Sequence, residues 1–224
     1  MLVIGDYATG KTSLIKRYTE GCFTPNYKLT IGVDFALKSV PQEGSEDVSL
    51  QLWDIAGHER FGCMTRVYYK YAIAAVIVYD MSRPATFDAV LTWLEDLNNK
   101  VCLANGERVP VVLVGNKCDS YEGPDVSEKM EAFTRQHGLV GWFPTSAKDN
   151  TNVDAAFECL LQNILQVADR QVVNTNDADT VVVQTQNQKD AGRNTGQSTS
   201  SNSRKGGNVG SKVDKKKKWL RCQI

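Results

Sequence analysis

Residues 5–12 place the strongest constraint on what this chain can fold into. Their sequence, GDYATGKT, fits the pattern GxxxxGK[ST] and lies between a short apolar strand and a run with helical periodicity. In that setting the backbone N–H groups of the loop wrap phosphate oxygens, Lys11 neutralises their charge, and the Thr12 hydroxyl coordinates Mg²⁺. An ordinary glycine turn would match the pattern in roughly 1% of chains of this length. We therefore predict phosphate contacts from Gly5, Asp6, Tyr7, Ala8, Thr9, Gly10, Lys11, Thr12 and Ser13.

Strand and helix patterns alternate up to about residue 169, which favours an α/β fold with a mostly parallel sheet covered by helices. Residues 72–79 and 109–114 are unbroken apolar runs, as expected of strands buried on both faces. Between them, residues 84–99 have helical spacing, with a proline at an early helical position. This order predicts a strand, helix, strand unit.

The two ends of this region carry further predictions. Residues 33–40 and 48–55 flank a turn-rich stretch, so they are predicted to form an antiparallel hairpin that makes the sheet mixed. Only four residues precede Gly5, so the first strand is short: either the start codon was assigned late, or this form has a weakened central strand. The closing helix begins behind a predicted Asn152 cap and places on one face Phe157, Leu160, Leu161, Ile164 and Leu165.

Charge and composition divide the chain into an acidic body and a basic tail. Residues 1–169 carry 15 Lys and Arg against 22 Asp and Glu, whereas residues 170–224 carry 11 against 4. The tail has few large apolar residues to offset ordering entropy, so we predict disorder there. No apolar run approaches the roughly 20 residues that span a bilayer, and the N-terminal residues show no basic segment followed by an apolar core, so we expect neither membrane insertion nor secretion. Six scattered cysteines without a CxxC pair suggest neither zinc nor a disulfide framework.

The sequence NKCD, residues 116–119, predicts recognition of a guanine base. A carboxylate at Asp119 can accept from both N1–H and the exocyclic amine of guanine, a pattern that adenine does not offer. Lys117 would pack its stem along the base, and Ser146, Ala147 and Lys148 would add contacts to the guanine carbonyl. Alone the motif could mark a solvated loop. After a phosphate loop it argues for a guanine nucleotide and against a P-loop kinase or ATPase. The predicted base contacts are Asn116, Lys117, Asp119, Ser146, Ala147 and Lys148.

A further group of residues predicts a magnesium site that senses the γ-phosphate. Asp54 ends a strand, where it would hold Mg²⁺ through water, and the Gly57 N–H would bond the γ-phosphate. Thr30 supplies a second hydroxyl beside that of Thr12. Since these contacts need the γ-phosphate, the segments around Thr30 and Gly57 are predicted to switch between order and disorder.

These motifs, in this order, resemble the Ras superfamily. IGVDF at 31–35, WDIAG at 53–57 and ERF at 59–61 resemble Rab proteins rather than Ras, Rho or Arf proteins. Three features further resemble the Rab branch that serves lysosome-related organelles: Ala56, IGVDFALK at 31–38 and MTRVYYK at 64–70.

The resemblance implies a P-loop GTPase domain over residues 1–169, with a six-stranded mixed sheet and about five helices, followed by a hypervariable tail over 170–224. It implies a protein that cycles between GTP and GDP with Mg²⁺ and recruits effectors in vesicle traffic. The implied partners are an exchange factor, an activating protein, an escort or dissociation-inhibitor protein, and a membrane surface, with no nucleic acid. The implied location is the cytosol and the cytoplasmic face of endosomal, lysosome-related or phagosomal membranes.

The same resemblance assigns roles to aromatic residues. Phe23 would stack on guanine and Tyr27 would cover the phosphates. An aromatic patch read by effectors would consist of Phe35, Trp53 and Tyr68. Strand parity supports exposure of Trp53, since it shares a face with polar residues; Phe35 and Tyr68 could instead be core aromatics.

The sequence departs from the Rab pattern in its catalytic region. The catalytic set implied by the resemblance is Lys11, Gly57 and His58, but His58 stands where most Rabs carry a glutamine that orients the attacking water. Ala8 replaces a common glycine, and Tyr7 is bulky beside the γ-phosphate. We therefore expect slow intrinsic hydrolysis, with an activating protein able to supply a glutamine and an arginine. The alternative is a binding module that stays largely locked with GTP.

The tail also departs from the pattern. Its single cysteine, Cys222, is third from the end, whereas CaaX prenylation requires the fourth position. Rab prenylation through an escort protein tolerates varied ends, so we expect a lipid on Cys222, the alternative being an unmodified tail. Four lysines at 215–218 would add about 1 kcal/mol each on an anionic membrane.

Overall fold

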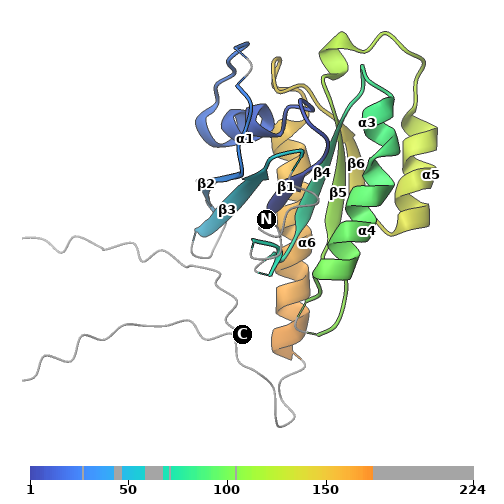
Figure 1. Ribbon diagram of the computed structural model, residues 1–224. Coiled ribbons are helices and arrows are strands. Elements are labelled where there is room, and N and C mark those ends of the chain that lie inside the picture. The colour runs from blue at the N-terminus through green and yellow to red at the C-terminus, as the bar shows by residue number, and fades with distance from the viewer. Residues whose placement is uncertain (27, 43–46, 59–67, 71, 104, 174–224) are drawn as a thin grey trace, which may run out of the picture.

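The protein was examined as a computed structural model, which describes residues 1–26, 28–42, 47–58, 68–70, 72–103 and 105–173. Its centre is a six-stranded sheet with the strand order β2-β3-β1-β4-β5-β6 (Figure 1). All neighbouring strands pair in parallel except β2 and β3. The strands are β1 (Leu2–Ile4), β2 (Val33–Val40), β3 (Val48–Ile55), β4 (Ala75–Asp80), β5 (Val111–Asn116) and β6 (Gly141–Pro144). The predicted mixed, mostly parallel α/β sheet is confirmed.

The hairpin of β2 and β3 has the bounds that the sequence predicts, and its ladder pairs Val33 with Ile55 and Val40 with Val48. β1 is short, as expected, yet it lies in the middle of the sheet, and its three side chains are fully buried. Successive side chains of β1 point to opposite faces of the sheet. Val3 belongs to the core cluster of one face, whereas Leu2 and Ile4 belong to that of the other.

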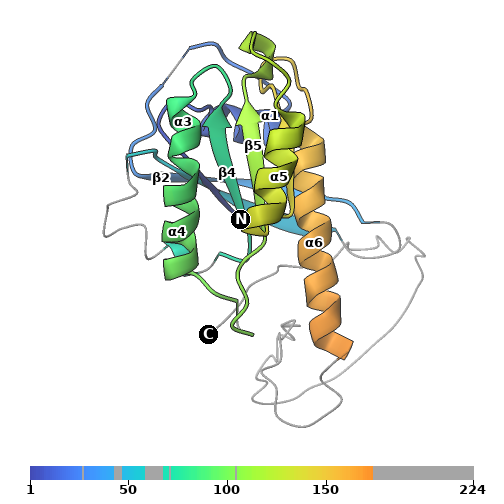
Figure 2. The ribbon, with the colours of Figure 1, turned by 90° about the vertical axis from the view of Figure 1, so that its right-hand side faces the viewer.

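Helices cover both faces of the sheet. α1 (Lys11–Glu20) and α6 (Val153–Val173) contribute to one core cluster, in which Tyr18 and Phe157 stack with ring centroids 4.3 Å apart. α4 (Val90–Lys100) and α5 (Ser127–His137) contribute to the other cluster, where Trp93 is 2% exposed. Figure 2 shows α6 continuing beyond the end of the sheet. Within the described residues, no helix combines the length and apolarity needed to cross a membrane.

The structure refines two local predictions. The helix predicted over residues 84–99 is present as α3 (Ala85–Asp88) and α4, and Ala89 between them keeps right-handed helical angles (φ −76°, ψ −13°). Thr86 lies in the first turn of α3. Its Oγ1 accepts from the Asp80 amide (2.9 Å) and donates to the Arg83 carbonyl (2.7 Å), and these bonds tie the turn to the end of β4. Asn152 does precede α6, and its backbone carbonyl accepts from the Ala156 amide (3.1 Å), but its φ of 52° differs from the extended backbone of a capping residue, and its side-chain amide donates to the Pro144 carbonyl (2.8 Å).

The loops that follow β1, β4, β5 and β6 leave the carboxyl ends of parallel strands, where open α/β sheets bind ligands. β3 runs parallel to β1 and brings its own carboxyl end to the same edge. The sheet therefore gathers at one edge the segments that the sequence assigns to phosphate, metal and base.

Candidate functional site: a guanine nucleotide and magnesium site

The phosphate loop connects β1 to α1, and close packing fixes it on both sides. Gly5 has a φ of 140° and Gly10 a φ of 93°, conformations that glycine adopts without strain. A Cβ at Gly5 would overlap the Val78 carbonyl, and one at Gly10 would overlap the Asn116 side chain. The two glycines of the motif are therefore required by backbone geometry.

Lys11 lies inside the curve of this loop. Its Nζ donates to the carbonyls of Gly5 (2.9 Å) and Asp6 (2.8 Å), and the residue is 6% exposed. Burial lowers the pKa of Lys11 to about 8, although the nearby Asp54 carboxylate partly opposes this. An ammonium group held in so little water gains strongly from a bound phosphate.

Three side-chain oxygens converge beside the first turn of α1. Thr12 Oγ1 donates to Asp54 Oδ2 (2.5 Å) and lies 2.9 Å from Thr30 Oγ1, which is itself 3.4 Å from Asp54 Oδ2. Among the described side chains, Asp54 Oδ1 is a buried oxygen without a hydrogen-bond partner. Burial raises the pKa of Asp54, against the hydrogen bonds from Thr12 and the charge of Lys11.

Hydroxyl and carboxylate oxygens in this arrangement are hard ligands of the kind that Mg²⁺ prefers. The unpaired Asp54 Oδ1 also leaves an acceptor for a metal-bound water. The three residues that the sequence predicts as metal ligands are thus brought together, and they fit the ion.

Asn116, at the end of β5, ties the base loop to the phosphate loop. It is 1% exposed, and its Nδ2 donates to the Thr9 carbonyl (2.8 Å). Its Oδ1 accepts from the Ala147 amide (3.3 Å). Lys117, with a φ of 63°, donates from Nζ to the Ala8 carbonyl (2.9 Å). Asn116 and Lys117 therefore hold the phosphate loop, a role that the sequence reading had not given them.

Asp119 is positioned by the loop that follows β6. Ser146 Oγ donates to Asp119 Oδ1 (2.7 Å), and Lys148 Nζ lies 3.9 Å from Oδ2. Burial opposes the ionisation of Asp119, but the hydrogen bonds from Ser146 and Ser120 outweigh it and hold the pKa of Asp119 below its usual value. The group is therefore an ionised double acceptor at neutral pH.

Arg17, which the sequence reading missed, supports this same loop from α1. Its guanidinium donates to the carbonyls of Ala147 (2.8 Å) and Lys148 (2.9 Å), across about 130 residues of chain. No motif includes Arg17, so only the fold could reveal this contact.

Gly57 lies against the phosphate loop, since a Cβ there would overlap the backbone of Asp6 and Tyr7. His58 follows it and is exposed, as is Tyr7 at 58%. Phe23 is half-buried and packs against the core cluster that includes α1 and α6. Tyr27, the ERF sequence at 59–61 and residues 64–67 lie outside the described residues, as does Cys222.

The three aromatic residues predicted as an effector patch lie in a row. The ring centroids of Phe35 and Trp53 are 5.7 Å apart, and those of Trp53 and Tyr68 are 5.3 Å apart. Phe35 is 56% exposed, which excludes the core alternative for it. Trp53, which strand parity predicts as exposed, is only half-exposed, and both Trp53 and Tyr68 pack against the core cluster that includes α4 and α5.

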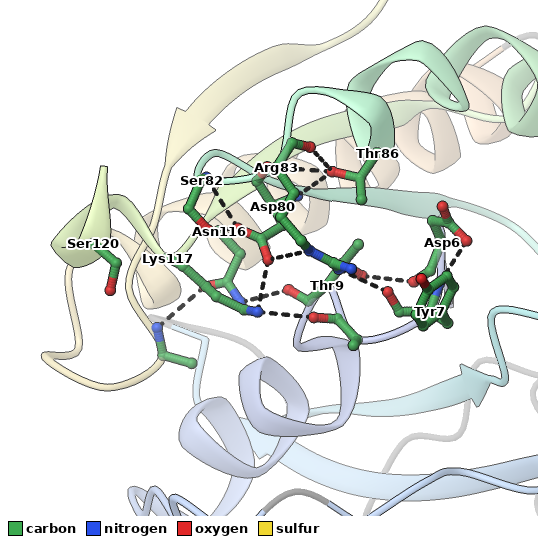
Figure 3. A network of polar contacts seen from close by, with 12 residues as sticks. Asp6, Tyr7, Thr9, Asp80, Ser82, Arg83, Thr86, Asn116, Lys117 and Ser120 are labelled. Atoms are coloured by element: carbon green, nitrogen blue, oxygen red, sulfur yellow. Dashed lines mark hydrogen bonds and ion pairs between the residues drawn. The ribbon is translucent and has the colours of Figure 1, made fainter. Parts of the chain in front are cut away.

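Figure 3 shows a polar network between the phosphate loop and the ends of β4 and β5. Asp80 Oδ2 accepts from Lys117 Nζ (2.7 Å) and from Arg83 Nε (2.9 Å). Sequence reasoning missed both Asp80 and Arg83, although an acidic residue that ends an apolar strand at this edge of the sheet was a usable signal.

The fold and this site together define a P-loop GTPase. A family model described as the Ras family matches residues 1–166. The chain belongs to the Ras family of small GTPases, and within that family to the Rab branch.

Its relatives include Rab-32B of Dictyostelium discoideum, which is 58% identical over 168 residues, covering 75% of this chain and 65% of that protein. Human Rab-32 is 52% identical over 166 residues, covering 74% of each chain. Human Rab-7L1 is 45% identical over 166 residues, covering 74% of this chain and 82% of that one. The resemblance to a Rab protein is confirmed, and the Rabs that it matches include Rab-32 and Rab-7L1.

Proposed function

We propose that this protein is a Rab-type switch that binds GTP and GDP with Mg²⁺ and recruits effectors to intracellular membranes in vesicle traffic. The observation that carries the proposal is the convergence of Thr12, Thr30 and Asp54 beside the phosphate loop. Thr30 and Asp54 come from segments on either side of β2, so a single ion with its nucleotide holds both segments.

Guanine selectivity rests on Asp119. Its carboxylate, oriented by Ser146 Oγ, would accept both the N1–H and the exocyclic amine of the base. Arg17 holds the Ala147 carbonyl, and the Ala147 N–H, which donates to Asn116 Oδ1 over a long 3.3 Å contact, would also donate to the guanine carbonyl. Adenine would leave Asp119 without these two donors once a base covers its carboxylate, and is therefore disfavoured by several kcal/mol, on the order expected for an acceptor that loses its hydrogen bonds.

Hydrolysis would use the residues that face the γ-phosphate. Mg²⁺, when bound, would neutralise charge on the phosphate oxygens. Lys11 would stabilise the charge that develops there, and the Gly57 N–H would hold a γ-oxygen. His58 would orient a water in line with the bond between the γ-phosphorus and the oxygen that it shares with the β-phosphate. As the water oxygen bonds to the γ-phosphorus, that bond breaks, the shared oxygen stays with GDP, and the γ-phosphoryl group leaves as phosphate.

We propose that this intrinsic step is slow. His58 is exposed, and an imidazole does not reproduce the paired donor and acceptor of a glutamine amide. Tyr7 adds a large, exposed side chain at the segment that packs against Gly57. The second candidate, a module largely locked with GTP, is favoured by the same two residues.

Contact with effectors and membranes completes the proposal. The row of Phe35, Trp53 and Tyr68 presents apolar surface beside the segments that hold Thr30 and Asp54, so a bound partner can read the nucleotide state. The basic tail, with a lipid on Cys222, would tether the domain to endosomal, lysosome-related or phagosomal membranes. A Cys222→Ser protein that stayed membrane-bound in cells would contradict the lipid part.

Single-turnover hydrolysis separates the two candidates. The protein is loaded with one equivalent of GTP, and phosphate release is followed with and without a candidate Rab activating protein. Slow release that the activating protein accelerates supports the cycling switch. Retention of GTP under both conditions supports the locked module. A protein that cannot be loaded with GTP contradicts both candidates.

A further inference from the structure

Three consecutive carbonyls of the phosphate loop are each held by a side chain from another part of the chain. Arg83 Nη2 donates to the Tyr7 carbonyl (2.8 Å), as Figure 3 shows. Lys117 Nζ donates to the Ala8 carbonyl (2.9 Å), and Asn116 Nδ2 donates to the Thr9 carbonyl (2.8 Å). Asn116 and Lys117 belong to the base motif, whereas Arg83 belongs to no motif and lies just after β4.

These contacts bear on nucleotide binding through the geometry of the peptide bond. The described residues contain no cis peptide, and in a trans peptide the C=O and the following N–H point in opposite directions. Holding the Tyr7 carbonyl outward therefore fixes the Ala8 N–H in the direction of the loop interior. Ala8 has a φ of 55°, which a residue with a Cβ does not favour, so the loop benefits from a contact that holds it there.

Arg83 is itself held on two sides. Its Nε donates to Asp80 Oδ2 (2.9 Å), the same oxygen that accepts from Lys117 Nζ (2.7 Å). The Asp80 side chain is 1% exposed, and its Oδ1 accepts from the Ser82 hydroxyl (2.6 Å). The Arg83 guanidinium also lies over the Tyr7 ring, 5.4 Å from its centroid.

We propose that Arg83 is a positioning residue of the nucleotide site, which holds the peptide between Tyr7 and Ala8 so that its N–H faces the phosphates. Through Asp80 it joins Lys117, so one buried carboxylate sets two of the three contacts to the loop. The inference rests on the proposed function, because it assumes that the loop binds a nucleotide.

The planar guanidinium is suited to this role because it donates to Tyr7 O and Asp80 Oδ2 at once from a rigid fork. A lysine at the same place would supply one flexible ammonium and could satisfy the geometry only in part. An alanine would leave the Tyr7 carbonyl to water and would leave Lys117 as the remaining donor to Asp80 Oδ2, while Ser82 still donates to Oδ1.

The test is the dissociation rate of a fluorescent GDP analogue from the full chain with Mg²⁺, chased with unlabelled GDP. Arg83→Ala should accelerate dissociation about tenfold, the effect of losing one hydrogen bond to a charged donor. Arg83→Lys should recover part of the loss, to within about threefold of wild type.

Arg135→Ala removes an exposed arginine from α5, away from the phosphate loop, and serves as the matched control, with no change expected. The melting temperature at saturating GDP is measured for every variant. Dissociation from Arg83→Ala within twofold of wild type would overturn the proposal while leaving the proposed function intact. If Arg83→Ala and Arg83→Lys accelerated dissociation of the GDP analogue equally and lowered the melting temperature equally, Arg83 would have a purely structural role, and the proposal would be overturned. A wild-type chain that binds no GDP analogue would overturn both.

Discussion

The Nζ of Lys117 lies 2.7 Å from Asp80 Oδ2, which joins the base loop after β5 to the end of β4. The contact is short and its carboxylate is almost fully buried, with 1% of the side chain exposed. Because Lys117 also donates to the Ala8 carbonyl, this ion pair connects the base and phosphate halves of the site.

Asp80 predicts a defined pH dependence of stability. Burial opposes its ionisation, but hydrogen bonds from Lys117, Ser82 and Arg83 outweigh burial and hold the pKa of Asp80 below its usual value. Near pH 4 the unfolded chain therefore binds more protons at this residue than the folded chain does. Its stabilising contribution is complete above about pH 5 and is lost as the pH falls below about 4.

Urea unfolding of wild type and Asp80→Asn over a range of pH, at matched concentrations of GDP and Mg²⁺, measures the contribution of Asp80 to the free energy of unfolding. The free energies of unfolding should differ by about 1–3 kcal/mol between pH 5 and 8, and the difference should shrink below pH 4. Asp125→Asn is the comparison variant: Ser127 also lowers the pKa of Asp125, but this carboxylate is exposed, so the same sign with a smaller difference is expected. A difference that grew as the pH fell would contradict the assigned sign.

The magnesium site predicts that chelation loosens the nucleotide. Removing Mg²⁺ with EDTA should accelerate GDP release from wild type at least tenfold, since the ion bridges phosphate and protein. Asp54→Asn should release GDP faster with Mg²⁺ present and respond less to EDTA, because the buried carboxylate is lost. Asp154→Asn, on the exposed side of α6, should behave as wild type. An undiminished EDTA response in Asp54→Asn would remove Asp54 from the ion's surroundings.

The base site predicts a change of specificity on substitution of Asp119. An asparagine replaces one acceptor oxygen by a donor, which suits a base with a carbonyl where guanine has its amine. Asp119→Asn should therefore lose GTP affinity at least a hundredfold and gain affinity for xanthosine triphosphate. Competition against labelled GDP gives both values, and loss of affinity for both nucleotides without any gain would instead indicate a collapsed loop.

His58 predicts slow intrinsic hydrolysis. In single-turnover measurements His58→Gln should hydrolyse bound GTP faster than wild type, by about tenfold, because a glutamine amide can both donate to and accept from the attacking water. GDP dissociation should be unchanged and serves as the internal control. An equal or lower hydrolysis rate in the variant would show that the histidine is not what limits the reaction.

The sequence predicted those parts of the site that contiguous motifs encode. Gly5, Lys11 and Thr12 follow from one octapeptide, and the long apolar runs of β4 and β5 left little doubt about central strands. Arg83 was not predictable in this way, because its partner Tyr7 lies 76 positions away and only the sheet order brings them together.

Contacts set by the fold explain what the local patterns do not reveal. Helical periodicity over residues 84–99 predicts the helical region of α3 and α4, but not that Thr86 accepts from the amide at the end of β4. Asn152 has the residue type of a cap, yet its φ of 52° differs from the extended backbone of a capping residue, and its side-chain amide donates to the Pro144 carbonyl.

The most direct test of the central claim is competition between GTP and ATP for the full chain. Labelled GDP is bound in the presence of Mg²⁺, and unlabelled GTP or ATP is titrated against it. The account predicts displacement by GTP at least a thousandfold more effectively than by ATP, because Asp119 accepts two donors that adenine lacks. Equal displacement by the two nucleotides would contradict a guanine-specific switch.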